Sequence, residues 1–354
     1  MRLTVKKVRL LIKCAKKILF LSLKAYKKTI SIELTVNILV IYTKRNKSKA
    51  GDYLKYYIGI DIGGTNIKYG LLNEEGLILD QGKVKTARND GDDIIVKIQE
   101  VVTKYEADYE IKAVGVSAPG SIRDDGFMIT GGAIKDFYGI NLKEILEDKI
   151  GLSVFLENDA NCAALAELWL GSGKEKKHFL FAGIGTAVGG AIVINGQLFK
   201  GANFNAGEFG YQIVNSINNN DTRLATLSLN GSVGHGIVDK YEERTDTKNL
   251  DGEALHTLAK SGEAVAVKVI DDFYYSLAKG IFNLTTAFDP EIVLIGGAIS
   301  KDKDFIIRLQ KEIDDLQKGH RDMGAVKVAR IKACHFLNDA GIIGAVYHAL
   351  TKHN

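Results

Sequence analysis

Three polar residues stand together where side chains of their type can do acid–base chemistry. Glu157, Asn158 and Asp159 follow an apolar run and precede an alanine-rich segment, so they lie between a predicted strand and a predicted helix. A carboxylate in this place can accept a proton from an attacking hydroxyl, which phosphoryl transfer requires. Asn158, Asp159 or Asn161 could instead cap the helix. We predict that Asp159 is a catalytic base.

Other side chains could bind an acceptor that carries several hydroxyl groups. The amide of Asn158 both donates and accepts hydrogen bonds. Glu208, in the segment NFNAGEFGY, has a carboxylate that can accept from two further hydroxyls. We therefore predict that Asn158 and Glu208 bind the substrate.

A glycine-containing turn near the start of the globular sequence could hold phosphate. The run YYIGIDIGGTNIKYGLLNEEG at 56–76 predicts two strands joined as a hairpin by Asp61-Ile62-Gly63-Gly64-Thr65-Asn66. Glycines 63 and 64 can adopt positive φ and let backbone N–H groups approach a phosphate, while Thr65 adds a hydroxyl. Asp61 can hold Mg²⁺ through its water shell. A bare tight turn with a capping Asp is the alternative.

The same arrangement returns more than a hundred residues later. After HFLFAGIG, the turn Gly185-Thr186-Ala187-Val188-Gly189-Gly190 leads into the strand-like AIVINGQLF. A third element, IVLIGGAIS at 292–300, is a predicted buried strand ending in Gly296 and Gly297, which would let an adenosine approach the backbone. The repetition predicts two related domains that each contribute one phosphate loop to a nucleotide.

Several common motifs are absent. GSGKEKK at 171–177 lacks the first glycine and the hydroxyl residue of a Walker A loop. Gly183-x-Gly185-x-x-x-Gly189 has the wrong spacing for a dinucleotide loop, and a strand follows it rather than a helix. GVSAP at 115–119 ends in proline, so it is not the nucleophile elbow of a serine hydrolase.

Charge and cysteine content limit the class of protein. Residues 1–53 hold 14 Lys/Arg and 2 Asp/Glu, whereas residues 54–354 hold 33 Lys/Arg and 41 Asp/Glu. Because the main body is acidic, the net charge of +4 does not indicate a nucleic-acid partner. The three cysteines are widely spaced and form no CxxC, which favours the reducing cytoplasm and gives no sign of a structural metal.

The first 53 residues have a character of their own. Lysines at 6, 13, 17, 24 and 28 fall on one helical face, which could suit a membrane surface, a targeting segment or a sequence outside the mature fold. No uncharged apolar run is long enough to span a bilayer, so we predict no stable membrane insertion. We favour the third interpretation, because the globular pattern starts near Leu54 and Met128 is the first methionine after Met1.

Taken in order, these segments resemble the ROK family of bacterial sugar kinases over Tyr56 to about Leu350. The matching motifs are DIGGTN, SAPGSI, ENDANCAALAE, GTAVGG, GxxxNAGEFGY, DPEIVLIGGAIS and NDAGIIGAVYHAL. The resemblance implies ATP and Mg²⁺ as cofactors, a hexose-type acceptor that is commonly phosphorylated at its 6-hydroxyl, and a homodimer. It also places Gly120, in SAPGSI, in a sugar-side loop.

Two departures affect the expected substrate. Many family members have a histidine after GExG and a nearby cysteine cluster that bind zinc, but here Tyr211 replaces the histidine and residues 212–240 contain no cysteine. The chain therefore resembles the zinc-less branch, which includes β-glucoside kinases, and we predict no structural zinc. Tyr211 could stack on a sugar face or belong to the core. Glucose or a β-glucoside is favoured, and N-acetylmannosamine remains open.

The combined prediction is an α/β protein with a two-domain, actin/hexokinase-like (ribonuclease H-like) fold. Residues 1–53 form a basic extension outside the fold, 54–170 the first domain, 171–334 the second, and 335–354 a helix that returns to the first domain. The predicted function is an ATP-dependent sugar kinase. A sugar-responsive transcriptional repressor of the same family is the alternative, although the extension lacks a second helix for a DNA-binding motif.

Overall fold

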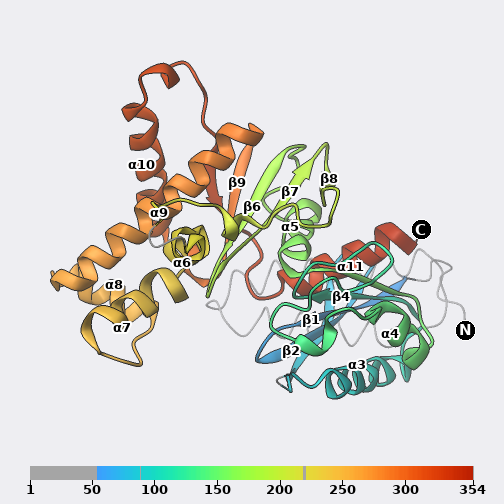
Figure 1. The fold of residues 1–354 in the computed structure, drawn as a ribbon. Helices are drawn as coiled ribbons and strands as arrows, with labels where there is room; N and C mark the ends of the chain where they lie inside the picture. Colours follow the sequence, from blue (N-terminus) through green and yellow to red (C-terminus); the bar gives the residue numbers. More distant parts are fainter. Residues whose placement is uncertain (1–53, 88, 218–220, 354) are drawn as a thin grey trace, which may run out of the picture. The chain divides into compact units, whose positions relative to one another are not determined.

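The computed structural model describes residues 54–353, except for 88 and 218–220. The predicted basic extension of residues 1–53 lies outside the described residues. Residues 54–354 form a compact unit that contains two five-stranded sheets (Figure 1).

The first sheet has the strand order β3-β2-β1-β4-β5. Its strands are β1 (Tyr56–Ile62), β2 (Asn66–Asn73), β3 (Ile78–Lys85), β4 (Ile111–Ala118) and β5 (Val154–Asn158). The pairs β1/β2 and β2/β3 are antiparallel, whereas β1/β4 and β4/β5 are parallel. The predicted hairpin around the first glycine turn is therefore confirmed, with Ile62 opposite Ile67 at its closed end.

Helices cover both faces of this sheet. They are α3 (Gly91–Glu106), α4 (Leu142–Ile150), α5 (Asp159–Trp169) and α11 (Ala340–His353). Because side chains alternate along a strand, Ile58 and Ile60 of β1 join the core that includes residues of α3 and α4, while Tyr57 joins the core that includes α11. In Figure 1, α3 and α4 accordingly lie on the face opposite α11.

Close approach to α11 requires small residues at two points. A Cβ on Gly115 of β4 would lie 2.0 Å from the carbonyl oxygen of Ala345, and one on Gly344 would lie 1.7 Å from that of Cys162 in α5. Any larger residue would push these elements apart. The C-terminal helix is thus pressed between β4 and α5, and it packs on the sheet formed by residues 56–158.

The second sheet has the strand order β10-β9-β6-β7-β8. Its strands are β6 (Phe179–Ile184), β7 (Val188–Ile194), β8 (Gln197–Leu198), β9 (Ile292–Gly296) and β10 (Arg330–Ala333). The antiparallel pair β6/β7 confirms the second predicted hairpin, and β6/β9 and β9/β10 are parallel.

The helices after β8 enclose the larger core. They are α6 (Leu227–Gly231), the π-helical turn η4 (Gly234–Asp239), α7 (Lys240–Thr245), α8 (Gly252–Lys260), α9 (Ala264–Phe288) and α10 (Lys303–Gly319). Short 3₁₀ turns are η1 (Lys135–Phe137), η2 (Phe209–Tyr211), η3 (Thr222–Ala225), η5 (Ala298–Lys301) and η6 (Arg321–Met323).

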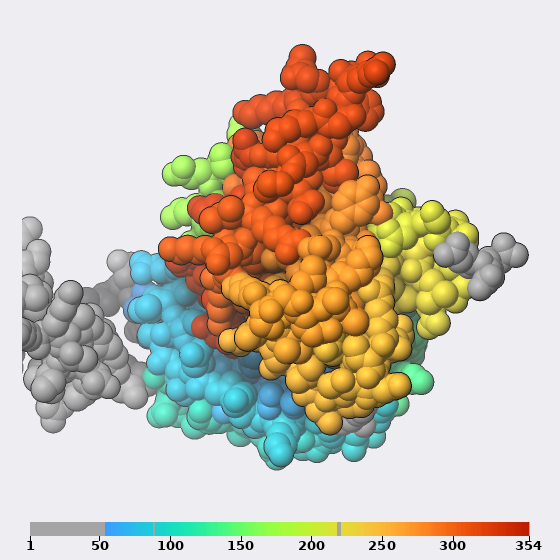
Figure 2. Space-filling view, turned by 90° about the vertical axis from the view of Figure 1, so that its left-hand side faces the viewer, coloured from blue at the N-terminus to red at the C-terminus, as the bar shows by residue number. Residues whose placement is uncertain are grey.

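The two faces of β6 meet different helices. Leu180 and Ala182 lie in the core with residues of α9 and α10, whereas Phe179 and Phe181 pack with Ala164 of α5. Helix α10 is visible at the molecular surface in Figure 2. Its Ile307 is 67% exposed. No helix of the described residues has the length and apolar character needed to cross a membrane.

Candidate active site

The predicted base lies at the junction of β5 and α5. Asn158 is the N-cap of α5, because its Oδ1 accepts hydrogen bonds from the N–H groups of Ala160 and Asn161 at 2.9 and 3.2 Å. The capping alternative therefore holds for Asn158 and leaves Asp159 as the first residue of the helix. A carboxylate in the first turn is favoured by the helix dipole.

The pKa of the Asp159 carboxyl group is higher than that of an ordinary aspartate. Its Oδ1 accepts from the N–H of Ala160 at 2.7 Å. This hydrogen bond and one with the side chain of Asn158 both favour the ionised carboxylate. Although the residue reaches solvent, protein surrounds the carboxyl closely enough for desolvation to raise its pKa to about 6. The charges of Asp61 and Glu208 raise the pKa further. Asp61 and Glu208, which come from distant segments of the chain, therefore lie close enough to influence the charge of Asp159.

Asp61 is the next-to-last residue of β1, and its carboxylate contacts two side chains. Its Oδ1 accepts from Ser117 Oγ at 2.8 Å, and Lys68 Nζ lies 3.7 Å from Oδ2. Burial raises the pKa of Asp61, while Ser117 and Lys68 oppose that shift. A Cβ on Gly341 would lie 2.5 Å from the Asp61 carboxylate, so only glycine permits this close approach of α11 to Asp61. The half-buried carboxylate of Asp61 is an oxygen ligand of the kind that suits a cation held through its water shell.

The first phosphate-loop candidate does not use the positive φ that its glycines can adopt. Neither Gly63 nor Gly64 has positive φ, so the turn does not depend on this property of glycine. The turn is closed instead by Gly63 N–H donating to the carbonyl of Asn66 at 3.1 Å. A Cβ on Gly64 would meet no heavy atom within 4 Å, and Thr65 is exposed, so both residues border open space.

Residues 232–234, where η4 begins, donate hydrogen bonds to the backbone carbonyls of the second loop. Gly185 O accepts from the N–H groups of Val233 and Gly234 at 2.9 and 3.1 Å, and Thr186 O accepts from Ser232 Oγ at 2.9 Å. Gly185 and Thr186 themselves are exposed. The carbonyl groups thus face the protein and are held in place by hydrogen bonds.

The turn after β9 does require a glycine. Gly297 has φ of 92°, and a Cβ there would lie 2.1 Å from the carbonyl oxygen of Ile184, at the end of β6. Gly296 precedes it as the last residue of β9. The turn and the second phosphate-loop candidate are therefore in direct contact through Ile184 and Gly185.

The predicted sugar-side residues lie on loops beside Asp159. Gly120, with φ of 102°, accepts a hydrogen bond from Asn158 Nδ2 at 2.9 Å through its carbonyl. With that contact and the helix cap, the amide of Asn158 is largely engaged within the protein, and its contact with a sugar remains a prediction. Glu208 is exposed at the start of η2, and partial desolvation raises its pKa.

Tyr211 ends η2 and is 75% exposed. Placement in the core, one of the two alternatives for this residue, is therefore wrong. Three positions separate Tyr211 from Glu208, and its N–H donates to the Glu208 carbonyl at 3.2 Å. The exposed ring thus belongs to the same short turn as Glu208.

Several site residues were not predicted from the sequence. Ser117 supports Asp61, Ser232 supports Thr186, and Lys200 Nζ lies 3.0 Å from Glu157 Oε2. A serine near the end of the apolar strand VGVSA was a usable signal for the first. No local pattern indicates the other two, because their partners are tens of residues away. Among the described residues, no group of three His, Cys, Asp or Glu side chains could hold a metal ion.

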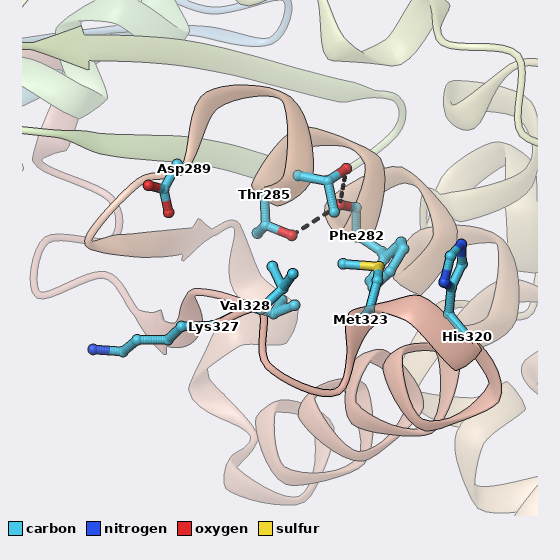
Figure 3. A pocket seen from close by; sticks show the side chains of 9 residues that line it. Phe282, Thr285, Asp289, His320, Met323, Lys327 and Val328 are labelled. Atoms are coloured by element: carbon cyan, nitrogen blue, oxygen red, sulfur yellow. Dashed lines mark hydrogen bonds between the residues drawn. The ribbon is translucent and has the colours of Figure 1, made fainter.

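A separate cavity of about 590 Å³ contains none of these residues. Phe282, Thr285 and Asp289 line it from the end of α9, together with Met323 and Val328 of the segment after α10 (Figure 3). Asp289 precedes β9, whereas Gly296 ends it. The cavity therefore lies at the opposite end of β9 from the predicted nucleotide turn.

Two sheets of the same strand order, with polar groups and glycine turns at the ends of β1, β5, β6 and β9, define an α/β enzyme of the actin/hexokinase-like fold. The ROK family model matches residues 57–352, and the chain belongs to this family.

Relatives and solved structures cover most of the chain. A β-glucoside kinase of Listeria monocytogenes is 36% identical over 298 residues, which are 83% of this chain and 97% of the relative. A ROK family protein of Streptococcus pneumoniae in complex with sucrose has a TM-score of 0.75 and 29% identity, covering 84% and 98%. A Streptomyces griseus glucokinase in complex with glucose and AMPPNP has a TM-score of 0.69 and 26% identity, covering 82% and 97%.

Proposed function

We propose that this protein, an ATP-dependent sugar kinase, phosphorylates the 6-hydroxyl of a β-linked glucoside. The 36% identical relative from Listeria monocytogenes and a 34% identical one from Klebsiella pneumoniae are named β-glucoside kinases. The observation that carries the proposal is Tyr211, because a 75% exposed ring three positions after Glu208 offers a stacking face for a second ring.

Asp159 is the proposed base. At pH 7 a carboxyl group with a pKa of about 6 is largely ionised, and it can accept the proton of the sugar hydroxyl. The hydroxyl oxygen then forms a bond to the γ-phosphorus, the bond from that phosphorus to the β–γ bridging oxygen breaks, and ADP departs with the electron pair. The proton stays on Asp159 until the product leaves.

Asp61 is the proposed contact to Mg²⁺, through water. Bound Mg²⁺ neutralises charge on the phosphate oxygens of the nucleotide. Asp61 supplies a negative charge at the end of β1, and Ser117 orients its carboxylate through the 2.8 Å hydrogen bond. The residues present therefore fit a hydrated cation.

The glycine turns are the proposed nucleotide contacts. We assign Gly63, Gly64, Thr65 and Asn66 to one side of the phosphates and Gly185 and Thr186 to the other, while Gly296 and Gly297 lie against the adenosine. Support comes from the exposure of both loops and the direct contact between Gly297 and the end of β6. The AMPPNP-bound relative from Streptomyces griseus favours the same use of the fold.

The repressor alternative has less support, because the relatives of at least 30% identity described above carry kinase names. We further propose that the enzyme acts as a homodimer in the cytoplasm. Cys162 and Cys334 are buried and unpaired, which suits a reducing compartment. Light scattering of the purified protein would measure the dimer directly.

A sugar panel tests the proposed acceptor. ADP release is measured with glucose, N-acetylmannosamine, mannose, fructose, cellobiose and methyl β-glucoside, with maltose as the α-linked control. We expect the β-glucosides to have the highest kcat/KM. A higher kcat/KM for free glucose, or equal values for cellobiose and maltose, would contradict the β-glucoside assignment.

Replacing the exposed ring sharpens this test. We expect Tyr211→Ala to lower kcat/KM for cellobiose by about threefold to tenfold, as loss of one stacked aromatic ring implies, and to leave glucose unchanged. Tyr275→Ala is the matched control, since Tyr275 is 51% exposed on α9. Equal losses on both sugars would show that Tyr211 does not contact the second ring.

A further inference from the structure

One lysine joins the loop before Glu208 to the strand before Asp159. Lys200 follows β8, and its Nζ lies 3.0 Å from Glu157 Oε2 and 2.9 Å from Asp124 Oδ1. The side chain of Lys200 is 15% exposed and that of Glu157 only 1%. The pair is therefore shielded from solvent on the Glu157 side, while Asp124 is 65% exposed.

Glu157 depends on this lysine. Its Oε1 accepts from Asn158 N–H at 2.8 Å and from Asn161 Nδ2 at 3.0 Å, so this oxygen is tied to the helix that begins at Asp159. Lys200 is the ion-pair partner of the other oxygen. A buried carboxylate that loses its partner is strongly disfavoured. Removing Lys200 would therefore disturb Glu157 and the adjoining catalytic residues.

The loop that follows Lys200 is held in a strained shape. Ala206 N–H donates to the Lys200 carbonyl at 3.1 Å, and Phe204 has φ of 59°, which is unusual for a bulky residue. Lys200 Nζ lies 5.2 Å from the centre of the Phe204 ring. A second link is made where Ser121 Oγ donates to Asn205 Oδ1 at 2.9 Å. The loop reaches Glu208 two residues after Ala206.

We propose that Lys200 is a positioning residue that holds the loop carrying Glu208 against β5, the strand that ends directly before Asp159. The pairing of Lys200 with Glu157 fixes the position of the Glu208 carboxylate relative to Asp159. Asp124, on the solvent side, is the second ion-pair partner of Lys200. This inference rests on the proposed roles of Asp159 and Glu208. It adds a residue that touches neither sugar nor nucleotide.

The direct test is Lys200→Met, which keeps much of the stem and removes the charge. We expect KM for the best sugar of the wild-type panel to rise at least tenfold and kcat to fall, because misplacement by about 1 Å can cost a hundredfold in rate. KM for ATP should not change. Lys200→Arg, which retains the charge, should recover most of the lost kcat/KM.

Controls separate positioning from general destabilisation. Lys104→Met removes a lysine from an ion pair with Asp80, 3.1 Å long, in which both side chains are 52% exposed, and should leave all constants unchanged. If Lys200→Met does not fold, Asp124→Asn tests the exposed arm, with an expected rise in sugar KM of about two- to fivefold, and an unchanged sugar KM would overturn the inference.

The outcomes distinguish this inference from the proposed function. If the wild-type enzyme phosphorylates no sugar, the function itself fails, whatever Lys200 does. If it does, the inference is overturned by parallel changes in the KM values of sugar and ATP, by unchanged constants in Lys200→Met, or by a Lys200→Arg variant no better than Lys200→Met.

Discussion

The two sheets share one plan and differ in what stands at their strand ends. In both, a central strand pairs antiparallel with the second strand of its hairpin and parallel with a strand reached by a long connection: β1 pairs with β2 and β4, and β6 with β7 and β9. The outer strands β3 and β8 are again antiparallel, and β5 and β10 again parallel.

The two sheets differ in the residues at their strand ends. The first sheet places Asp61 at the end of β1, Ser117 near the end of β4 and Asn158 at the end of β5, directly before Asp159. At the end of β9 and just after it, the second sheet has Gly296 and Gly297. The strand order is therefore independent of the chemistry, which is decided by a few terminal residues. In our proposal the first sheet supplies the base, the contact to the cation and one phosphate turn, and the second supplies the other phosphate turn and the adenosine turn.

The largest expected effect comes from removing the proposed base, Asp159, from the first sheet. We expect Asp159→Asn to lower kcat by about 10²- to 10⁴-fold, the usual contribution of a general base. The helix N-terminus should persist, because Asn158 provides the cap. ADP release with the best sugar measures the effect, and circular dichroism checks the fold.

Asp304→Asn is the matched control, since Asp304 also lies in the first turn of a helix, α10, on the second sheet's side. Its rate should stay at the wild-type value. Near wild-type turnover in Asp159→Asn would remove Asp159 as the base and with it the division between the sheets.

The pH dependence should be controlled by the same carboxyl group. With a pKa of about 6, Asp159 loses its negative charge below that pH, so kcat/KM should fall about tenfold per pH unit on the acid side. An initial-rate profile that reads ADP directly measures this limb. A midpoint near pH 4, the ordinary aspartate value, would show that neither desolvation nor the charges of Asp61 and Glu208 act on the base.

The same pKa has a consequence for stability. A carboxyl pKa raised on folding means that the folded state binds this proton more tightly, so the stabilisation is complete below about pH 4 and lost as pH rises through about 6. At pH 7.5 the charged form therefore opposes folding. Asp159→Asn should accordingly melt no lower than the wild-type protein at that pH.

The repeated hairpins and the apolar strand at 292–296 were readable from the sequence because strand alternation and turn glycines are local signals. The helix cap was also foreseen, although three residues competed for it and only the structure selects Asn158. The backbone geometry at Gly63 and Gly64 could not be predicted from the sequence, because glycine permits positive φ without requiring it. The link from Lys200 to Glu157 joins positions that no local pattern relates.

The smallest expected effect on rate compares one glycine from each sheet. Gly297→Ala forces a Cβ to within 2.1 Å of Ile184 O at φ of 92°, so we expect a loss of about 1–3 kcal/mol in the free energy of unfolding and a higher KM for ATP. Gly64→Ala meets no atom within 4 Å and has no positive φ, so its stability should not fall.

If Gly64 nevertheless lies against a phosphate, as proposed, Gly64→Ala should raise KM for ATP without lowering the melting temperature. Denaturant unfolding and ATP titrations of both variants separate these cases. A destabilised Gly64→Ala would mean that the first turn is constrained by the fold itself, as the second sheet's turn is. An unchanged KM for ATP in both variants would show that neither glycine is close to the nucleotide.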